Sequence, residues 1–139
     1  MKLKILLESP SAHHKVVAVM DGDECLTEVF LNDLADNYQA SAHGLLRLIE
    51  QIVERGLEVL STKQCHQVDK ENKIYELIKG DIRLLFFKGH GNTLIVTTHA
   101  FIKKTKKTPE KDKSKAIRYK KEYQLAHDKN QIDFIREED

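Results

Sequence analysis

The fold of this chain is decided by residues 73–88, which read Lys-Ile-Tyr-Glu-Leu-Ile-Lys-Gly-Asp-Ile-Arg-Leu-Leu-Phe-Phe-Lys. Two runs rich in aliphatic and aromatic residues flank Gly80-Asp81, a spacing typical of a tight β-hairpin. A second turn leads into residues 93–101, whose β-branched and apolar character suits a central strand. The sequence therefore predicts three antiparallel strands joined in chain order. A fourth strand is predicted at residues 15–20, a short β-branched run.

Two helices are predicted between the first strand and the hairpin. Apolar residues recur at helical spacing in residues 26–38 and again in residues 42–53. Ser41 is a suitable N-cap for the second helix, and Gly56 stands where a helix commonly ends. We therefore expect a helical hairpin, followed by a polar loop at residues 61–72.

Most of the positive charge follows the last predicted strand. Residues 101–123 hold ten Lys or Arg and three acids, a net charge of +7, whereas the whole chain carries +1. Thr108 as an N-cap, Pro109 at the first helical position and Glu110 in the first turn predict a helix here. A concentration of positive charge beside a sheet edge indicates a partner rich in phosphate.

The composition indicates one soluble globular domain. The chain has 139 residues, of which 40% are hydrophobic and 32% charged. We place the domain at residues 15–127, between an N-terminal extension (1–14) and an acidic tail (128–139). No apolar run is long enough for a membrane span or a signal peptide, so we expect a cytoplasmic protein without a membrane partner. Because Cys25 and Cys65 lack the spacing of a metal or redox site, we expect no metal and no cofactor.

Four motifs occur in a fixed order along the second half of the chain. They are Tyr75-Glu76-Leu77, Ile82-Arg83-Leu84-Leu85-Phe86-Phe87, His99-Ala100-Phe101-Ile102-Lys103-Lys104-Thr105 and Thr108-Pro109. With the predicted order of elements, they resemble the HigB-like toxins of the RelE superfamily over roughly residues 15–123. The most specific part of the likeness is the segment at residues 99–109, followed by a helix that carries Ala116 and Tyr123.

The resemblance implies an α+β protein with the RelE-like fold. That fold is a small, twisted, mainly antiparallel sheet packed against two N-terminal helices, with a basic C-terminal helix. The resemblance also implies the toxin of a type II toxin-antitoxin system, a metal-independent endoribonuclease that cleaves mRNA, usually on the translating ribosome, and so inhibits translation. A helix-turn-helix antitoxin encoded next door would neutralise it. The chain departs from the family at Ile78, where an Arg often follows the Glu-Leu pair.

The implied reaction uses the 2′-hydroxyl of RNA as its nucleophile. The protein must remove the hydroxyl proton, stabilise the phosphoryl oxygens and protonate the leaving 5′ oxygen. We expect Arg83 to bind the phosphate in the transition state, although an ion pair with Glu76 or Asp81 across the hairpin is the alternative. Lys103 and Lys104 leave the last strand beside that hairpin and are expected to contact the scissile region.

His99 is a candidate general acid or base, although a lone His in a strand is more often structural. Which role applies depends on whether the His99 side chain faces the core or the cleft. The alternation of side chains along a strand predicts that Thr97, His99 and Phe101 share one face of the sheet. Tyr119 is a candidate for stacking on a base, and Tyr123 fits the packed side of the helix better. The candidate RNA-binding residues are Lys79, Lys106, Lys107, Lys111, Lys115 and Tyr119.

A second interpretation stays open because of Ile78. Lys79 is a possible substitute for the missing Arg, but it belongs to the opposite face of the strand unless the register slips. The alternative is a non-catalytic protein of the same fold that binds RNA, DNA or a protein partner, as a degenerate toxin or a phage accessory protein would. Arg83 and the double lysine favour the nuclease, and Ile78 favours the alternative.

Overall fold

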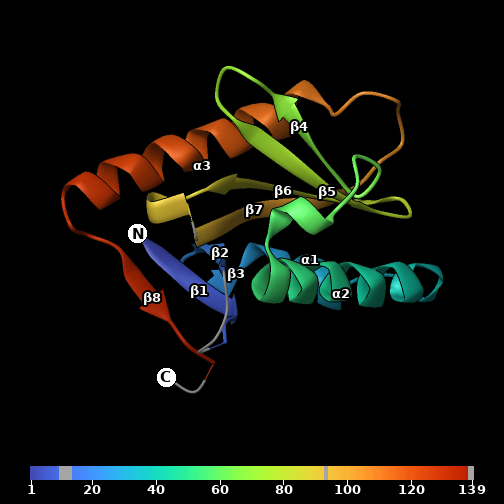
Figure 1. Cartoon of the computed structure of the whole chain (residues 1–139), viewed down its shortest axis with the longest axis horizontal. Coiled ribbons are helices and arrows are strands. Elements are labelled where there is room, and N and C mark those ends of the chain that lie inside the picture. The colour runs from blue at the N-terminus through green and yellow to red at the C-terminus, as the bar shows by residue number, and fades with distance from the viewer. Residues whose placement is uncertain (10–13, 93, 138–139) are drawn as a thin grey trace.

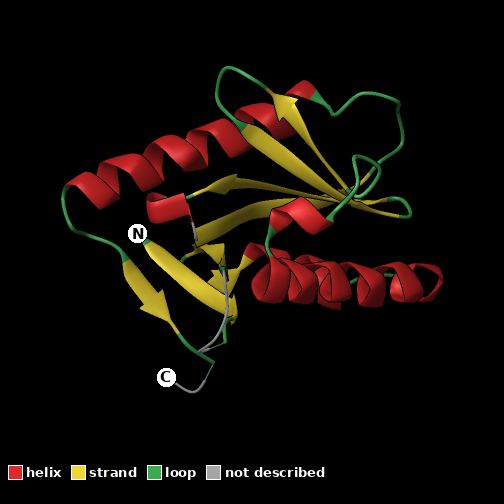
Figure 2. Ribbon diagram, in the orientation of Figure 1, coloured by secondary structure: helices red, strands yellow, loops and turns green. Residues whose placement is uncertain are grey.

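The computed structural model describes residues 1–9, 14–92 and 94–137. Within these ranges, eight strands form one sheet and three α-helices pack against it (Figures 1 and 2). The strands are β1 (Lys2–Leu7), β2 (Lys15–Asp21), β3 (Glu24–Cys25), β4 (Cys65–Asp69), β5 (Ile74–Lys79), β6 (Ile82–Lys88), β7 (Leu94–Ile102) and β8 (Asp133–Ile135). The α-helices are α1 (Leu26–Asn32), α2 (Gln39–Arg55) and α3 (Glu110–Asp128), and the 3-10 turns are η1 (Asp36–Tyr38), η2 (Leu57–Val59) and η3 (His90–Asn92). The fold class is mixed α+β, as the sequence predicts.

The predicted hairpin lies in one half of the sheet, between the edge strand β4 and the central strand β7. Strands β5 and β6 pair antiparallel without a register shift, and Lys79 opposite Ile82 closes the turn. Gly80 in that turn has φ +58°, in the left-handed region that glycine adopts at no steric cost. The sheet order is β4-β5-β6-β7-β2-β1-β8, with β3 pairing to β2 alone. It is mainly antiparallel, and the parallel pairs are β2 with β7 and β1 with β8.

A β-bulge in β7 changes the predicted facing of its side chains. Leu84 on β6 pairs with Ala100, and Phe86 pairs with Thr97, so β7 carries an extra residue between these two pairs. Strict alternation is therefore interrupted, and Thr97 and His99 face opposite sides of the sheet. The prediction that Thr97, His99 and Phe101 share one face is wrong for Thr97.

The helices cover both faces of the sheet (Figure 1). Helix α2 buries its apolar stripe in one core, and α3 contributes to a second core across the sheet. The predicted helix end at Gly56 is confirmed, but α2 begins at Gln39, so Ser41 lies inside the helix and is not its cap. The helix predicted over residues 26–38 is shorter in the structure, because α1 ends at Asn32. Asn32 and Asp33 have low helix propensity, and the backbone is extended at Ala35.

Helix α3 follows the cationic segment as predicted, but its first turn differs in detail. Pro109 is the N-cap, and no side chain caps the helix. Thr108, which we expected to be the cap, points to Glu76 instead. The predicted packing residues Ala116 and Tyr123 are both buried. The hydroxyl of Tyr123 also accepts a hydrogen bond of 2.9 Å from the backbone N–H of His90.

Four strands lie in segments where none is predicted, and one of them is the two-residue β3 beside β2. Strand β4 lies in the expected loop at residues 61–72 and pairs antiparallel with β5. The expected N-terminal extension supplies β1, which pairs with β2, and the expected tail supplies β8, which pairs with β1. These strands are short and two lie at sheet edges, so their formation depends on neighbours that are distant in the sequence. Residues 10–13, 138 and 139 of these segments lie outside the described residues. No helix in the described part of the chain has the length and hydropathy needed to cross a membrane.

Candidate functional site

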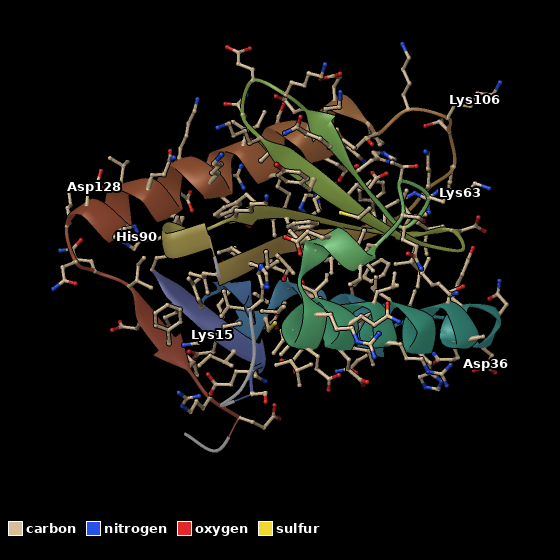
Figure 3. All side chains as sticks on the ribbon, in the orientation of Figure 1. Lys15, Asp36, Lys63, His90, Lys106 and Asp128 are labelled. Atoms are coloured by element: carbon tan, nitrogen blue, oxygen red, sulfur yellow. The ribbon has the colours of Figure 1, made fainter. Side chains whose placement is uncertain are left out.

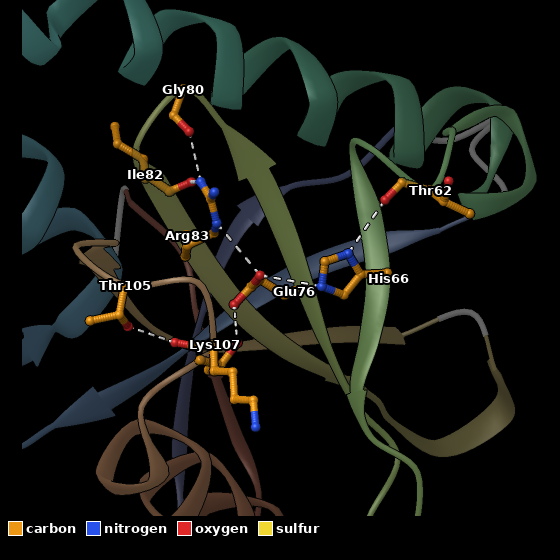
Figure 4. A network of polar contacts seen from close by, with 9 residues as sticks. Thr62, His66, Glu76, Gly80, Ile82, Arg83, Thr105 and Lys107 are labelled. Carbon is orange, nitrogen blue, oxygen red and sulfur yellow. Dashed lines mark hydrogen bonds and ion pairs between the residues drawn. The ribbon is translucent and has the colours of Figure 1, made fainter.

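A carboxylate without exposed surface lies at the centre of the candidate site. Glu76 on β5 is 0% exposed, and its Oε2 accepts a 2.8 Å hydrogen bond from the Thr108 hydroxyl. The other carboxylate oxygen, Oε1, lies 3.4 Å from His66 Nε2 and 3.5 Å from Arg83 Nε. Figure 4 shows His66 and Arg83 on either side of Glu76. We call Glu76, His66, Arg83 and Thr108 the Glu76 network.

The strand register explains why the network forms. Glu76 stands directly opposite His66 on β4 and Leu85 on β6, and Leu85 belongs to the core shared with α3. The Glu76 side chain therefore points toward the α3 side of the sheet. Because burying an unpaired carboxylate is costly, a position like this needs hydrogen-bond donors and positive charge around it. Thr108 supplies a hydrogen bond to Oε2, Arg83 supplies positive charge 3.5 Å from Oε1, and His66 lies 3.4 Å from the same oxygen.

Arg83 is held by the hairpin turn. Its side chain is 12% exposed, and Nη1 donates hydrogen bonds to the backbone oxygens of Gly80 at 2.7 Å and Ile82 at 3.0 Å. Its Nε and Glu76 Oε1 are both enclosed and lack a hydrogen bond. In the described part of the chain Nη2 also makes no hydrogen bond, but it is not among the enclosed atoms. Arg83 thus makes the ion pair with Glu76 that was the alternative to phosphate binding, and it also keeps a terminal nitrogen open to a ligand.

The loop between β7 and α3 lies beside this arginine. We call residues 103–109 the cationic loop. The backbone N–H of Lys103 donates a 2.8 Å hydrogen bond to the Asp81 carbonyl, which joins the loop to the hairpin turn. Lys103 is half-buried, whereas Lys104, Lys106 and Lys107 are exposed, and Figure 3 shows Lys106 at the outer bend. Arg83 and Lys103 are thus brought to the same end of the hairpin, as predicted.

His99 is enclosed beneath the start of α3. It is 5% exposed, with Nε2 at 3.0 Å from Asp112 Oδ1 and Nδ1 at 3.1 Å from the Thr98 hydroxyl. Burial lowers the pKa of His99, although the hydrogen bond with Asp112 opposes this shift. A neutral ring that donates from Nε2 to Asp112 and accepts at Nδ1 satisfies both contacts. In this arrangement His99 holds α3 against β7 and offers neither nitrogen to a substrate.

The remaining basic candidates divide between two places. Lys111 and Lys115 line a shallow hollow of 640 Å³ on α3, together with Arg118. Beside it, the Arg118 guanidinium lies 5.2 Å from the ring centre of half-buried Tyr119. Lys79 is separate from these residues, because its side chain lies across Gly44 of α2 on the other face of the sheet.

Three residues of the network, Glu76, His66 and Thr108, escaped prediction as site residues. His66 lies in the segment expected to be a loop, and Thr108 was assigned to a helix cap. The available signal was Glu76, a charged residue in an apolar strand whose register directs it inward. Within the described ranges, no three His, Cys, Asp or Glu side chains gather closely enough to hold a metal ion.

The fold and the site define a small mixed α+β protein with a cationic surface built around an arginine and a buried carboxylate. The model of the family described as "Phage derived protein Gp49-like (DUF891)" matches residues 30–121, well over half of the chain, and the chain belongs to this family. The family is part of the RelE/HigB-type toxin group, which agrees with the resemblance seen in the sequence. A search of the curated proteins found no match for this chain. The matched range contains every candidate residue discussed above.

Proposed function

We propose that this protein is the toxin of a type II toxin-antitoxin system, has a RelE-like fold and cleaves mRNA on the translating ribosome without a metal ion. Family membership supports the toxin, and one structural observation supports the cleavage. Arg83 is held by two backbone carbonyls and leaves Nη2 open beside the cationic loop. A guanidinium held in this way can donate from Nη2 to a phosphate oxygen and keeps its charge at any physiological pH.

The roles of the residues follow from their positions. Arg83 stabilises the negative charge that develops on the phosphoryl oxygens as the 2′ oxygen attacks. Lys103 and Lys104 begin the cationic loop next to Arg83 and contact the scissile phosphate. His99 acts through Asp112 by holding the start of α3, which positions the other end of the same loop. The catalytic role first considered for His99 is not part of this proposal, because its ring is enclosed.

The outer cations supply affinity. Lys106 and Lys107 on the loop are exposed, and Lys111 and Lys115 line the hollow on α3. Each phosphate contact releases counterions, so these residues strengthen binding to any RNA and make it depend on salt. Tyr119 offers part of its ring to a base next to Arg118. Lys79 lies on the other face of the sheet and takes no part in this surface.

The partners of the proposal are mRNA, the ribosome and a helix-turn-helix antitoxin, in the cytoplasm. An antitoxin that covers the cationic loop would neutralise the protein by excluding RNA. Expression of the chain alone should arrest growth, and coexpression with the product of a neighbouring helix-turn-helix gene should restore it.

A second candidate function is binding without cleavage. Ile78 is the cross-strand partner of Arg83, so the position where relatives often have a second Arg faces the first one directly. With Ile there, a single guanidinium remains at this point of the hairpin. A protein of this kind would hold RNA through its lysines and leave it intact.

Messenger RNA ends mapped in an active translation extract distinguish the two functions. We expect wild-type protein to create new ends that primer extension detects, and Arg83→Ala and Lys104→Ala to abolish them. Arg47→Ala removes an exposed arginine from α2 on the other face and should cleave like the wild type. Intact message with folded, RNA-binding wild-type protein would leave the non-catalytic function.

A further inference from the structure

His66 has an environment suited to a proton-transfer group. It lies on β4 with 40% of its side chain exposed, and its Nε2 faces the wholly buried Glu76 carboxylate at 3.4 Å. Its Nδ1 lies 3.4 Å from the backbone oxygen of Thr62. One side of the ring therefore lies beside an enclosed carboxylate, and the other side lies at the surface against a long, exposed contact that a ligand can displace.

His66 and Arg83 share their contact atom. Both approach Glu76 Oε1, so His66 Nε2 and Arg83 Nε are no more than about 7 Å apart. The imidazole and the guanidinium therefore lie beside the same carboxylate oxygen. Long contacts such as 3.4 Å are common in unliganded sites and shorten when substrate binds.

Two buried atoms without hydrogen bonds also indicate a functional role for the Glu76 network. Glu76 Oε1 and Arg83 Nε are buried without a hydrogen bond, although Glu76 Oε2 is satisfied by Thr108. A buried carboxylate oxygen without a hydrogen bond is unusual in a folded protein and needs an explanation, of which a catalytic role is one. The groups adjacent to this oxygen are the imidazole of His66 and the guanidinium of Arg83.

We propose that His66 is the general acid of the RNA cleavage, donating a proton from Nδ1 to the leaving 5′ oxygen, and that Glu76 is the residue that positions its ring through Nε2–H. This inference rests on the proposed function. The 2′ oxygen forms a bond to phosphorus as the bond from phosphorus to the 5′ oxygen breaks. The 2′-hydroxyl proton goes to water, the Nδ1 proton goes to the 5′ oxygen, and Nδ1 later regains a proton from water. The products are a 2′,3′-cyclic phosphate and a 5′-hydroxyl.

Two histidine variants, one at the proposed general acid and one as a control, test the proposal in the same translation extract. His66→Gln should lower the cleavage rate by roughly 10²-fold to 10⁴-fold, the usual contribution of a general acid, with RNA binding retained. His43→Gln changes an exposed histidine on α2 across the sheet and should cleave at the wild-type rate. Thermal unfolding of both variants must match the wild type for the comparison to count. Cleavage by His66→Gln at the wild-type rate would overturn the proposal.

A message with sulfur in place of the 5′ bridging oxygen at the mapped cleavage position separates a general acid from a structural residue. Sulfur leaves without protonation, so His66→Gln should cut this message within a few-fold of the wild-type rate. Slow cleavage of both messages by His66→Gln would refute proton donation to the leaving group. If wild-type protein cuts neither message, the nuclease function itself fails, and if wild type cuts while His66→Gln is unimpaired, only the role of His66 fails.

Discussion

Replacing Thr108 with Val removes one hydroxyl and keeps the shape of the side chain. The hydroxyl donates a 2.8 Å hydrogen bond to Glu76 Oε2, and both residues are buried. A hydrogen bond to a charged partner contributes about 1.5–3 kcal/mol, and its loss leaves a buried carboxylate with one donor fewer. We therefore expect Thr108→Val to lower the free energy of unfolding by about 2 kcal/mol.

Thr108→Asp distinguishes this role from that of a helix cap. Asp is as good an N-cap as Thr, so a capping residue would tolerate the change. In the structure no side chain caps α3, and the new carboxylate would lie beside that of Glu76. Two enclosed carboxylates repel each other, so Thr108→Asp should destabilise the protein more than Thr108→Val does.

Urea unfolding followed by circular dichroism measures both effects. Thr108→Ser keeps the hydroxyl and serves as the matched control, with a midpoint close to that of the wild type. The dependence of the unfolding free energy on urea should be the same for all four proteins, because the buried area hardly changes. A Thr108→Asp protein as stable as the wild type would refute the assignment of Thr108 to the Glu76 network.

Three further predictions follow from charge and burial. Because the pKa of folded His99 is below the ordinary value of 6.5, the unfolding free energy should fall as the pH drops below about 6.5, by at most about 1.4 kcal/mol per pH unit. His99→Gln should remove that slope in urea titrations at several pH values, and an unchanged slope would contradict it. Burial raises the pKa of Cys65 to about 11, so iodoacetamide should label it slowly at pH 8 in the folded protein and quickly in urea, as mass spectrometry can follow. Lys111→Ala should weaken RNA binding alike for all sequences and reduce the slope of log affinity against log salt by about 1, whereas exposed Lys129→Ala at the far end of α3 should change neither.

The predictable parts of the fold are those whose signals are local. The β5–β6 hairpin follows from two apolar runs around Gly80-Asp81, and the turn has the positive φ that only glycine adopts without cost. The end of α2 at Gly56 has a similar origin, since this residue has φ +89°. Tyr123 could be assigned to the core because helical spacing puts it on the same side of α3 as Ala116.

The unpredicted parts depend on pairing between distant segments. Strand β1 is held by β2 on one side and by β8, some 130 residues away, on the other. The apolar side chains of strand β4, Cys65 and Val68, are three residues apart, so its sequence lacks the period-two alternation by which a strand is recognised. Its existence follows from the free edge that β5 offers, a feature of the assembled sheet.

The candidate site divides in the same way. Arg83 and the lysines of the cationic loop could be found from the sequence, because a charged residue in an apolar strand and a dense cationic run are local features. The place of His66 could not, since it depends on the register of β4 against β5. The bulge in β7 likewise turns His99 toward α3, and a regular strand would have kept it on the face of Thr97.

The position of Glu76 connects the stability of this protein to its proposed activity. Its carboxylate contacts side chains from β4, β6 and the cationic loop, so a single buried negative charge sets the geometry of the surface that would bind RNA. A protein with a well-packed apolar residue at this position would often be as stable as one with Glu76, because the cost of desolvating a buried charge offsets much of the stabilisation that its partners contribute. A carboxylate at this position is therefore better explained by the geometry of the site than by stability. Without Glu76, Arg83 would keep its hydrogen bonds to the hairpin turn, but Thr108 would lose its acceptor and His66 would lose the carboxylate oxygen beside its Nε2.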